Sequence, residues 1–200
     1  MIKTIKFKRH AGQGGATLIE ALVSILVLSL GLLGMAGLQL NALSFQKSSW
    51  ATHRISEITA DIGERIRANP LGDQNGRYRY RTTYATSSTE TLVSNGCRDF
   101  GSADCAFDRI ARDDLAAWLG KAQRALPGGA VRLEGDGKTG YTVTAMYADK
   151  ELVNAAGVPQ ASAICVAATA GVAWRNCCPA DAAVPDGVRC YRSNIVTSLE

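Results

Sequence analysis

Six cysteines are the residues of this sequence with the clearest chemistry. They are Cys97, Cys105, Cys165, Cys177, Cys178 and Cys190. An even number of cysteines, all C-terminal to a long apolar segment, predicts disulfide bonds formed in an oxidising compartment. Zinc ligands usually come in pairs separated by two to four residues, whereas eleven residues separate the adjacent pair at 177 and 178 from the next cysteine on either side. We therefore expect no metal site.

The pairing of these cysteines is only partly indicated by their spacing. Cys97 and Cys105 form the most plausible local bond. Adjacent cysteines are poorly placed to bond each other without strain. Each member of the adjacent pair is therefore expected to bond a different one of Cys165 and Cys190, and the sequence leaves both arrangements open.

Residues for acid–base or nucleophilic catalysis are scarce. Beyond the first 15 residues there is a single histidine, His53, on a predicted helix, so a Ser-His-Asp or Cys-His arrangement in the C-terminal part is excluded. The adjacent acids Asp113 and Asp114 are expected near the start of a helix, where negative charge favours the helix dipole. We expect neither an enzyme nor a cofactor.

One short motif resembles the end of a phosphate-binding loop, at Gly137-Lys138-Thr139. Such a loop needs another glycine five residues before its second one, and Arg132 stands there. We expect a hairpin turn instead, with positive φ angles at Gly135, Gly137 and Gly140.

The element that precedes all of these residues is a long apolar helix. From Ala21 to Gln46 the sequence contains no charged residue, and a bilayer core needs roughly 20 apolar residues. We expect residues 18–43 to be embedded in a membrane. Four of the 22 basic residues lie within the first 15 residues, with no acidic residue among them. This leader predicts a cytoplasmic N-terminus and places the cysteines outside the cytoplasm.

Two ordinary kinds of segment are alternatives for this helix. A secretory signal has an apolar region of roughly 7–15 residues with its cleavage site after it, but here Gly14-Gly15 precedes the longer run. A plain signal-anchor fits the hydropathy equally well. Glu20 distinguishes the segment, because a carboxylate at the start of a membrane helix is costly and needs a partner.

The block from Gly15 to Glu20, Gly-Ala-Thr-Leu-Ile-Glu, resembles the signal of type IV pilins and pseudopilins. The resemblance implies that a prepilin peptidase cuts after Gly15 and methylates Ala16, although the family usually has phenylalanine at this position. It also implies that Glu20 pairs with the N-terminal amine of a neighbouring subunit during assembly. The implied partners are the peptidase, the major and other minor pilins, and the inner-membrane assembly platform.

The resemblance divides the chain into three parts. Residues 1–15 are a cleaved leader, residues 16–69 a long helix, and residues 70–200 a disulfide-containing domain in the periplasm and then in the filament. The second half of the helix has an amphipathic pattern, with isoleucines at 55, 58, 62 and 66. Asn69-Pro70 is expected to end the helix after residue 68.

The remaining sequence predicts an α+β domain with an antiparallel sheet. A second helix is expected over 109–125, with its apolar side chains at helical spacing: Leu115, Trp118, Leu119, Ala122 and Leu126. Strands are expected over 130–133, 141–147, 163–168 and 189–199.

The stretch from 71 to 96 reads as a loop containing a candidate strand over 77–84. There Arg77, Arg79 and Arg81 alternate with two tyrosines, so that arginines line one face. Interleaved arginines and tyrosines can contact nucleic acid or another surface. A solvated face of a half-buried strand is favoured, because beyond the leader the basic residues equal the 18 acidic ones.

Several later blocks resemble the PilV family of minor pilins, the type IV pilus modification proteins. They are Arg67-Ala68-Asn69, the Cys97…Cys105 spacing, Asp114-Leu115-Ala116-Ala117-Trp118 and Leu126-Pro127-Gly128-Gly129. The resemblance covers roughly residues 10–150 and implies a part in pilus assembly, initiation or modification. A type II secretion pseudopilin, and a pilus-tip adhesin or DNA-binding minor pilin, are the alternatives.

Overall fold

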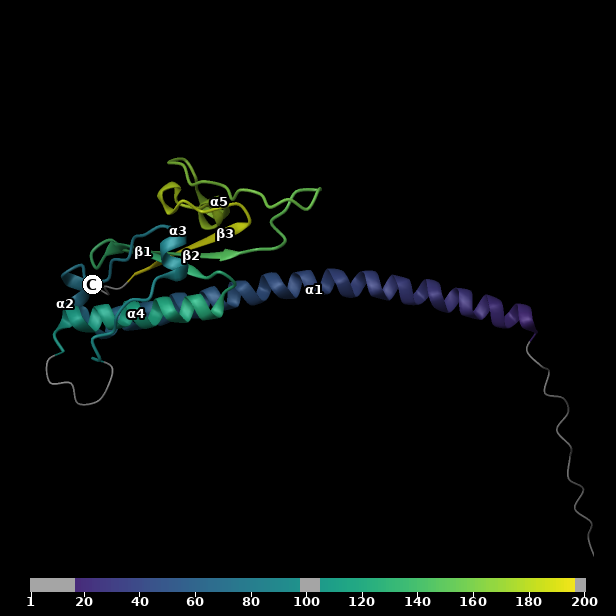
Figure 1. Cartoon of the computed structure of the whole chain (residues 1–200), viewed down its shortest axis with the longest axis horizontal. Coiled ribbons are helices and arrows are strands. Elements are labelled where there is room, and N and C mark those ends of the chain that lie inside the picture. The colour runs from purple at the N-terminus through teal and green to yellow at the C-terminus, as the bar shows by residue number, and fades with distance from the viewer. Residues whose placement is uncertain (1–16, 98–104, 197–200) are drawn as a thin grey trace, which may run out of the picture. The chain divides into compact units, whose positions relative to one another are not determined.

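The computed structural model describes residues 17–97 and 105–196, apart from the side chains at 44, 47 and 48. The chain divides into two compact units, Met1–Ser48 and Ser49–Glu200. Helix α1, Leu18–Ala68, contributes to both units (Figure 1). Each unit is described by itself.

The first unit consists, in its described part, of the apolar half of α1. Its aliphatic side chains are exposed; Leu22, Ile25 and Leu33, for example, are 68%, 64% and 70% exposed. The 26 residues Leu18–Leu43 have the length and composition of a membrane-spanning helix. Ser24 and Ser29 donate their hydroxyls to carbonyls one turn earlier, at Glu20 and Ile25, so these hydroxyls are satisfied within the helix.

The second unit is built on the other half of α1, which ends at Ala68 as predicted. A short helix follows directly, α2, Pro70–Gln74. Asn69 caps α2 by accepting a hydrogen bond from the backbone N–H of Gly72. Its amide nitrogen donates to the hydroxyl of Tyr78 and to the carbonyl of Phe107. Asn69 therefore both ends the long helix and ties three separate segments together.

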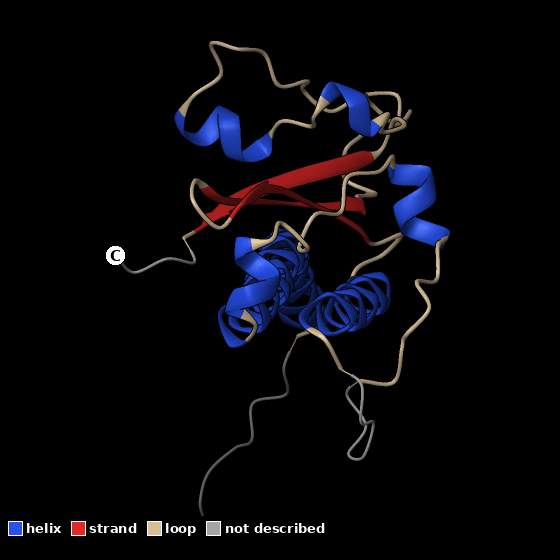
Figure 2. Ribbon diagram, turned by 90° about the vertical axis from the view of Figure 1, so that its left-hand side faces the viewer, coloured by secondary structure: helices blue, strands red, loops and turns tan. Residues whose placement is uncertain are grey.

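A three-stranded antiparallel sheet forms the middle layer of this unit. Its strands are β1, Ala130–Asp136, β2, Gly140–Ala148, and β3, Val188–Ile195, in the order β1-β2-β3. Helix α4, Phe107–Ala125, and the second half of α1 cover one face of the sheet (Figure 2). The domain thus has the predicted α+β layout.

The main core lies between this face and the two helices. The isoleucines at 55, 58, 62 and 66 are at most 1% exposed, as their spacing predicted. The fully buried Trp118 donates its indole N–H to the carbonyl of Ile58 at 2.9 Å. α4 is therefore joined to α1 by a buried hydrogen bond as well as by apolar packing.

The opposite face of the sheet is covered by the connection between β2 and β3. This connection includes α5, Gly171–Asn176, and a short 3-10 helix, Ala180–Ala182. A smaller buried cluster joins it to the sheet, and its members are Ala130, Met146, Cys178, Ala182, Val188 and Cys190.

The connection begins with a tight excursion over residues 152–160. It is closed by the hydrogen bond from Gln160 N–H to the carbonyl of Leu152, at 2.9 Å. Inside it, Asn154 N–H donates to Val158 and Gly157 N–H donates to Asn154. Many of the backbone hydrogen-bonding groups of the excursion therefore have partners within it.

Two predicted strands are wrong. Over 77–84 the only ladder contact is the bridge between Tyr80 and Leu133, and helix α3, Tyr84–Thr89, begins where the strand was expected to end. The side chain of Thr83 caps α3 by accepting from Thr86 N–H. The expected strand over 163–168 is reduced to a bridge between Ile164 and Cys178, because its backbone bonds the segment around Cys178 and not the sheet: Cys165 N–H donates to the carbonyl of Cys178, and Cys178 N–H donates to that of Ala163.

The other boundaries differ by a few residues. α4 begins at Phe107 rather than 109. The predicted strand over 189–199 corresponds to β3 at 188–195, and residues 197–199 lie outside the described part.

The hairpin turn between β1 and β2 was correctly predicted, but not all of its φ angles. Gly135 and Gly140 have φ of 122° and 85°, whereas Gly137 is not among the residues with positive φ. A Cβ on Gly137 would lie 2.7 Å from the carboxylate of Asp73, so a larger residue there would have to displace that side chain.

Candidate assembly segment and surface sites

The candidate assembly segment is the start of α1. Glu20 lies in the first turn of the helix and its side chain is exposed. No residue of the described part forms an ion pair with it. The predicted cleavage site, Gly15 and Ala16, lies outside the described residues. The segment therefore presents a carboxylate at the head of an uncharged apolar helix.

Three glycines, at 31, 34 and 37, lie along this apolar half. A Cβ added to any of them would meet nothing within 4 Å in the described part of the chain. Contacts inside the single chain therefore do not require glycine here, and the stripe is open to close packing by another helix.

The three arginines of the 77–81 segment do not act as one surface. Arg81 lies 3.1 Å from Glu134 and 2.5 Å from Asp181, measured between nitrogen and carboxylate oxygen. Arg77 and Arg79 are exposed and pair with no other described residue. Only two of the three candidate contact residues thus present free guanidinium groups.

The tyrosines of this segment are not available for stacking on nucleic acid bases. Tyr78 is fully buried. Burial and the hydrogen bond to Asp114 raise its pKa above the usual range. Tyr80 is half-buried and donates to Glu90 at 2.7 Å. The alternation of arginine and tyrosine is therefore that of a segment with one buried side, and the aromatic half of a nucleic-acid site is missing.

Asp113 and Asp114 do not lie at the start of a helix, as the sequence suggested. They lie about two turns into α4, beyond its first turn, and are 1% and 8% exposed. Asp113 accepts hydrogen bonds from the backbone N–H groups of Asn95 and Cys97. Asp114 accepts from Arg65 at 3.0 Å and from Tyr78 at 2.6 Å. The two acids are structural groups that attach the preceding segments to α4.

The structure contains three disulfides. They join Cys97 to Cys105, Cys165 to Cys177 and Cys178 to Cys190. The local pair is the expected one, and the adjacent cysteines take different partners. This arrangement is one of the two that the sequence left open.

Sequence reasoning missed a cluster of charges around one buried arginine on the outer face of the sheet. The side chain of Arg132 is 1% exposed and donates to both carboxylate oxygens of Asp181, at 2.9 and 2.8 Å. Hydrogen bonds from Arg132, opposed by partial burial and assisted by Arg81, hold the pKa of Asp181 below its usual range. The only sequence signal was the position of Arg132 between two apolar residues of a strand, since its partner is 49 residues away.

A groove runs between the second half of α1 and β3. Ser56, Gly63 and Arg67 line it on the helix side, and Ser193 and Asn194 on the strand side. Among the described residues, no group of His, Cys, Asp and Glu side chains has the arrangement of a metal site.

Comparison with known proteins adds no relative: no protein-family model, no curated protein and no solved structure matches this chain.

Proposed function

We propose that this chain is a minor pilin, most similar to the PilV family, that takes part in assembling or modifying a type IV pilus. One observation carries the proposal. α1 carries Glu20 in its first turn, continues as an uncharged membrane-length stretch and runs without a break to Ala68. The isoleucines of its second half belong to the core of a disulfide-bonded domain. A plain signal-anchor needs neither the leading carboxylate nor the continuation into the core.

The physical role of each part follows from this arrangement. Removal of residues 1–15 leaves Ala16 with a free amine close to the head of the helix. A bilayer or a filament core strongly disfavours the unpaired carboxylate of Glu20, so the amine of a neighbouring subunit is a suitable partner for it. The single helix holds the chain in the inner membrane, with the disulfide domain in the periplasm, until pilins and the assembly platform draw it into the filament.

The deciding experiment has two arms. The first is the N-terminal sequence and intact mass of the membrane-extracted protein from cells with and without the prepilin peptidase. A start at Ala16 that depends on the peptidase is expected. A start at Met1, or a cut after the apolar run, would overturn the proposal.

The second arm replaces Glu20 by Ala and measures membrane insertion and incorporation into sheared pili. Incorporation should fall while insertion persists. Glu64→Ala is the matched control, because Glu64 is another exposed acid of α1, paired only with Arg67 one turn away among the described residues. Loss of exoprotein secretion with normal pili, after deletion of the protein, would assign it to a type II secretion machine instead.

A further inference from the structure

The three disulfides differ in their surroundings. Cys178 and Cys190 are 0% and 4% exposed and belong to a buried cluster. Cys97 is half-buried, and its backbone N–H donates to the carboxylate of Asp113. Burial shields Cys178–Cys190 from external thiols. Negative charge beside a cysteine disfavours its thiolate, which applies to Cys97.

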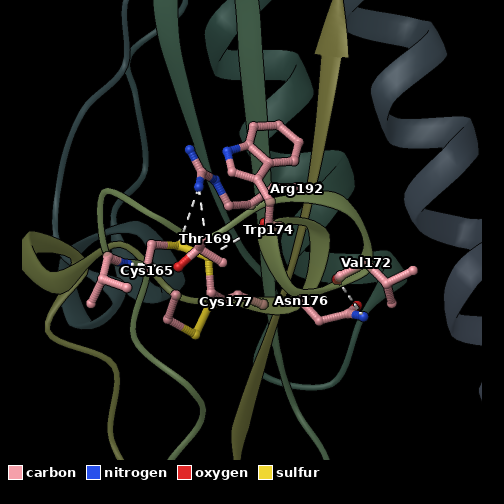
Figure 3. Close-up of a disulfide and its surroundings, with 10 residues drawn as sticks. Cys165, Thr169, Val172, Trp174, Asn176, Cys177 and Arg192 are labelled. Atoms are coloured by element: carbon pink, nitrogen blue, oxygen red, sulfur yellow. Dashed lines mark hydrogen bonds between the residues drawn. A yellow bond between two sulfur atoms is a disulfide. The ribbon is translucent and has the colours of Figure 1, made fainter.

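The Cys165–Cys177 bond lies instead against a positive charge. Nη1 of Arg192 lies 3.2 Å from Sγ of Cys165 and 3.7 Å from Sγ of Cys177 (Figure 3). The guanidinium also stacks on the indole of Trp174, with its central carbon 4.4 Å from the ring centroid. Trp174 thus holds the cation beside both sulfur atoms.

Arg192 has no carboxylate partner among the described residues. Its Nε is buried without a hydrogen-bond partner there. Burial lowers the pKa of Arg192, with attraction to Glu134 and repulsion from Arg132 as smaller influences. A guanidinium in this position is stabilised by any negative charge that forms beside it, and a thiolate on Cys165 or Cys177 would be such a charge.

Accessibility selects which sulfur is attacked. Cys165 is half-buried and so partly exposed, whereas Cys177 is 1% exposed. Thiol–disulfide exchange begins when an external thiolate attacks one sulfur and the other leaves as a thiolate. Attack from solvent therefore falls on Cys165, and Cys177 is the leaving group.

We propose that Cys165–Cys177 is a thiol-exchange site for a dithiol oxidoreductase of the exported compartment, with Arg192 stabilising the thiolate that leaves. The oxidoreductase thiolate bonds to Sγ of Cys165, the Cys165–Cys177 bond breaks, and its electron pair stays on Cys177. The second thiolate of the oxidoreductase then attacks its own sulfur in the mixed disulfide and releases Cys165. The protein disulfide gains two electrons and two protons, and the oxidoreductase dithiol becomes a disulfide.

Opening of this bond would free the segment between residues 165 and 177, which contains α5. It would also place the thiolate of Cys177 next to the Cys178–Cys190 bond. That thiolate can attack the neighbouring bond, so the site links the pairing seen here to the alternative pairings of the four C-terminal cysteines. This role does not depend on the proposed function in pilus assembly.

The test uses the full chain in detergent micelles, with 2-mercaptoethanol as the attacking thiol. Samples are quenched with acid, alkylated and mapped by peptide mass spectrometry, so that the opening rate of each disulfide is obtained separately. The first mixed disulfide should be on Cys165, and Cys165–Cys177 should open faster than Cys178–Cys190. A first adduct on Cys177, or faster opening of Cys178–Cys190, would overturn the proposal.

Arg192→Met shows whether Arg192 speeds the opening of Cys165–Cys177 through its charge or slows it by covering the bond. A nearby positive charge lowers the pKa of a thiol and a leaving thiol of lower pKa leaves faster, so loss of Arg192 should slow the opening of Cys165–Cys177 by about three- to tenfold. Unchanged or faster opening would mean that Arg192 only packs over the bond, and would overturn the role assigned to it. Arg189→Met, on the same strand and paired with Asp149, should leave this rate unchanged.

A second variant covers the case in which Arg192→Met disturbs the fold, visible as faster opening of Cys178–Cys190 as well. Arg192→Lys keeps a cation at the site and should open Cys165–Cys177 within about twofold of the wild-type rate. A fall of the kind expected for Met would then count against the proposal.

Discussion

The hydroxyl of Tyr78 donates a hydrogen bond of 2.6 Å to a carboxylate oxygen of Asp114, although the two residues are 36 positions apart. The other carboxylate oxygen accepts from Arg65 of α1 at 3.0 Å. One buried carboxylate on α4 thus holds both the long helix and the segment that follows it.

We expect Asp114→Asn to lower the free energy of unfolding by about 2–4 kcal/mol, because it leaves the half-buried Arg65 without one charge partner and weakens the bond to Tyr78. Urea unfolding in detergent, followed by tryptophan fluorescence, measures this. Asp108→Asn is the control on the exposed first turn of α4 and should change stability by less than about 0.5 kcal/mol. Equal effects of the two variants would contradict the structural role of Asp114.

Two glycine-to-alanine substitutions should differ in their effect on the stability of the domain. A Cβ on Gly129 would lie 2.2 Å from the carbonyl oxygen of Ala122, so Gly129→Ala should destabilise the domain by about 1–3 kcal/mol through overpacking. A Cβ on Gly63 of α1 would lie 3.4 Å from a methyl group of Ile195. Gly63→Ala should therefore be neutral or stabilise by up to about 1 kcal/mol, because alanine favours helix. Thermal melts of both variants under identical conditions decide the comparison.

Acid should weaken the domain partly through Asp181. Its pKa is held below the usual range by Arg132, so in acid the unfolded chain binds a proton more readily than the folded chain. This contribution is complete above the ordinary aspartate pKa of about 3.9 and is lost as the pH falls below it. In Asp181→Asn the stability should change less steeply with pH over that acidic window than in wild type, as measured by urea midpoints. An unchanged slope would show that another group is responsible.

The Cys178–Cys190 bond should contribute more to stability than the Cys97–Cys105 bond. It closes a loop with a separation of 12 residues, for which chain entropy alone predicts about 3 kcal/mol, and its sulfurs lie in a buried cluster. Double alanine variants of each pair, compared by denaturant unfolding, test the order. A larger loss for the pair at 97 and 105 would contradict it.

Helical periodicity was the most informative signal in the sequence. The isoleucines of α1 and the apolar face of α4 are buried as expected, because apolar residues spaced three and four apart lie on one face of a helix and are buried together. Asn69-Pro70 gave the end of α1 for a similar reason, since the residue before proline disfavours the helical region.

Long-range polar contacts could not be read in the same way. From the sequence, Arg132 and Asp113 are expected to be exposed charges. Their burial depends on partners distant in the chain: Asp181 for Arg132, and the backbone of Asn95 for Asp113. The strand predicted over 163–168 has suitable composition, but a strand also needs a partner, and within this range Ile164 alone forms a bridge, to Cys178. Local sequence carries no information on either kind of partner. The role of Glu20 in subunit assembly and the cleavage site after Gly15 remain predictions from the sequence alone.

The closed excursion over residues 152–160 has a practical consequence. Ala155 and Ala156 at its tip are exposed, and the hydrogen bond between Leu152 and Gln160 seals the stem beneath them. Extra residues inserted between these alanines would lengthen the loop without breaking a strand, and loop closure costs little per added residue. An epitope inserted there would leave both chain ends untouched, which makes it a suitable label for following the protein from membrane to filament.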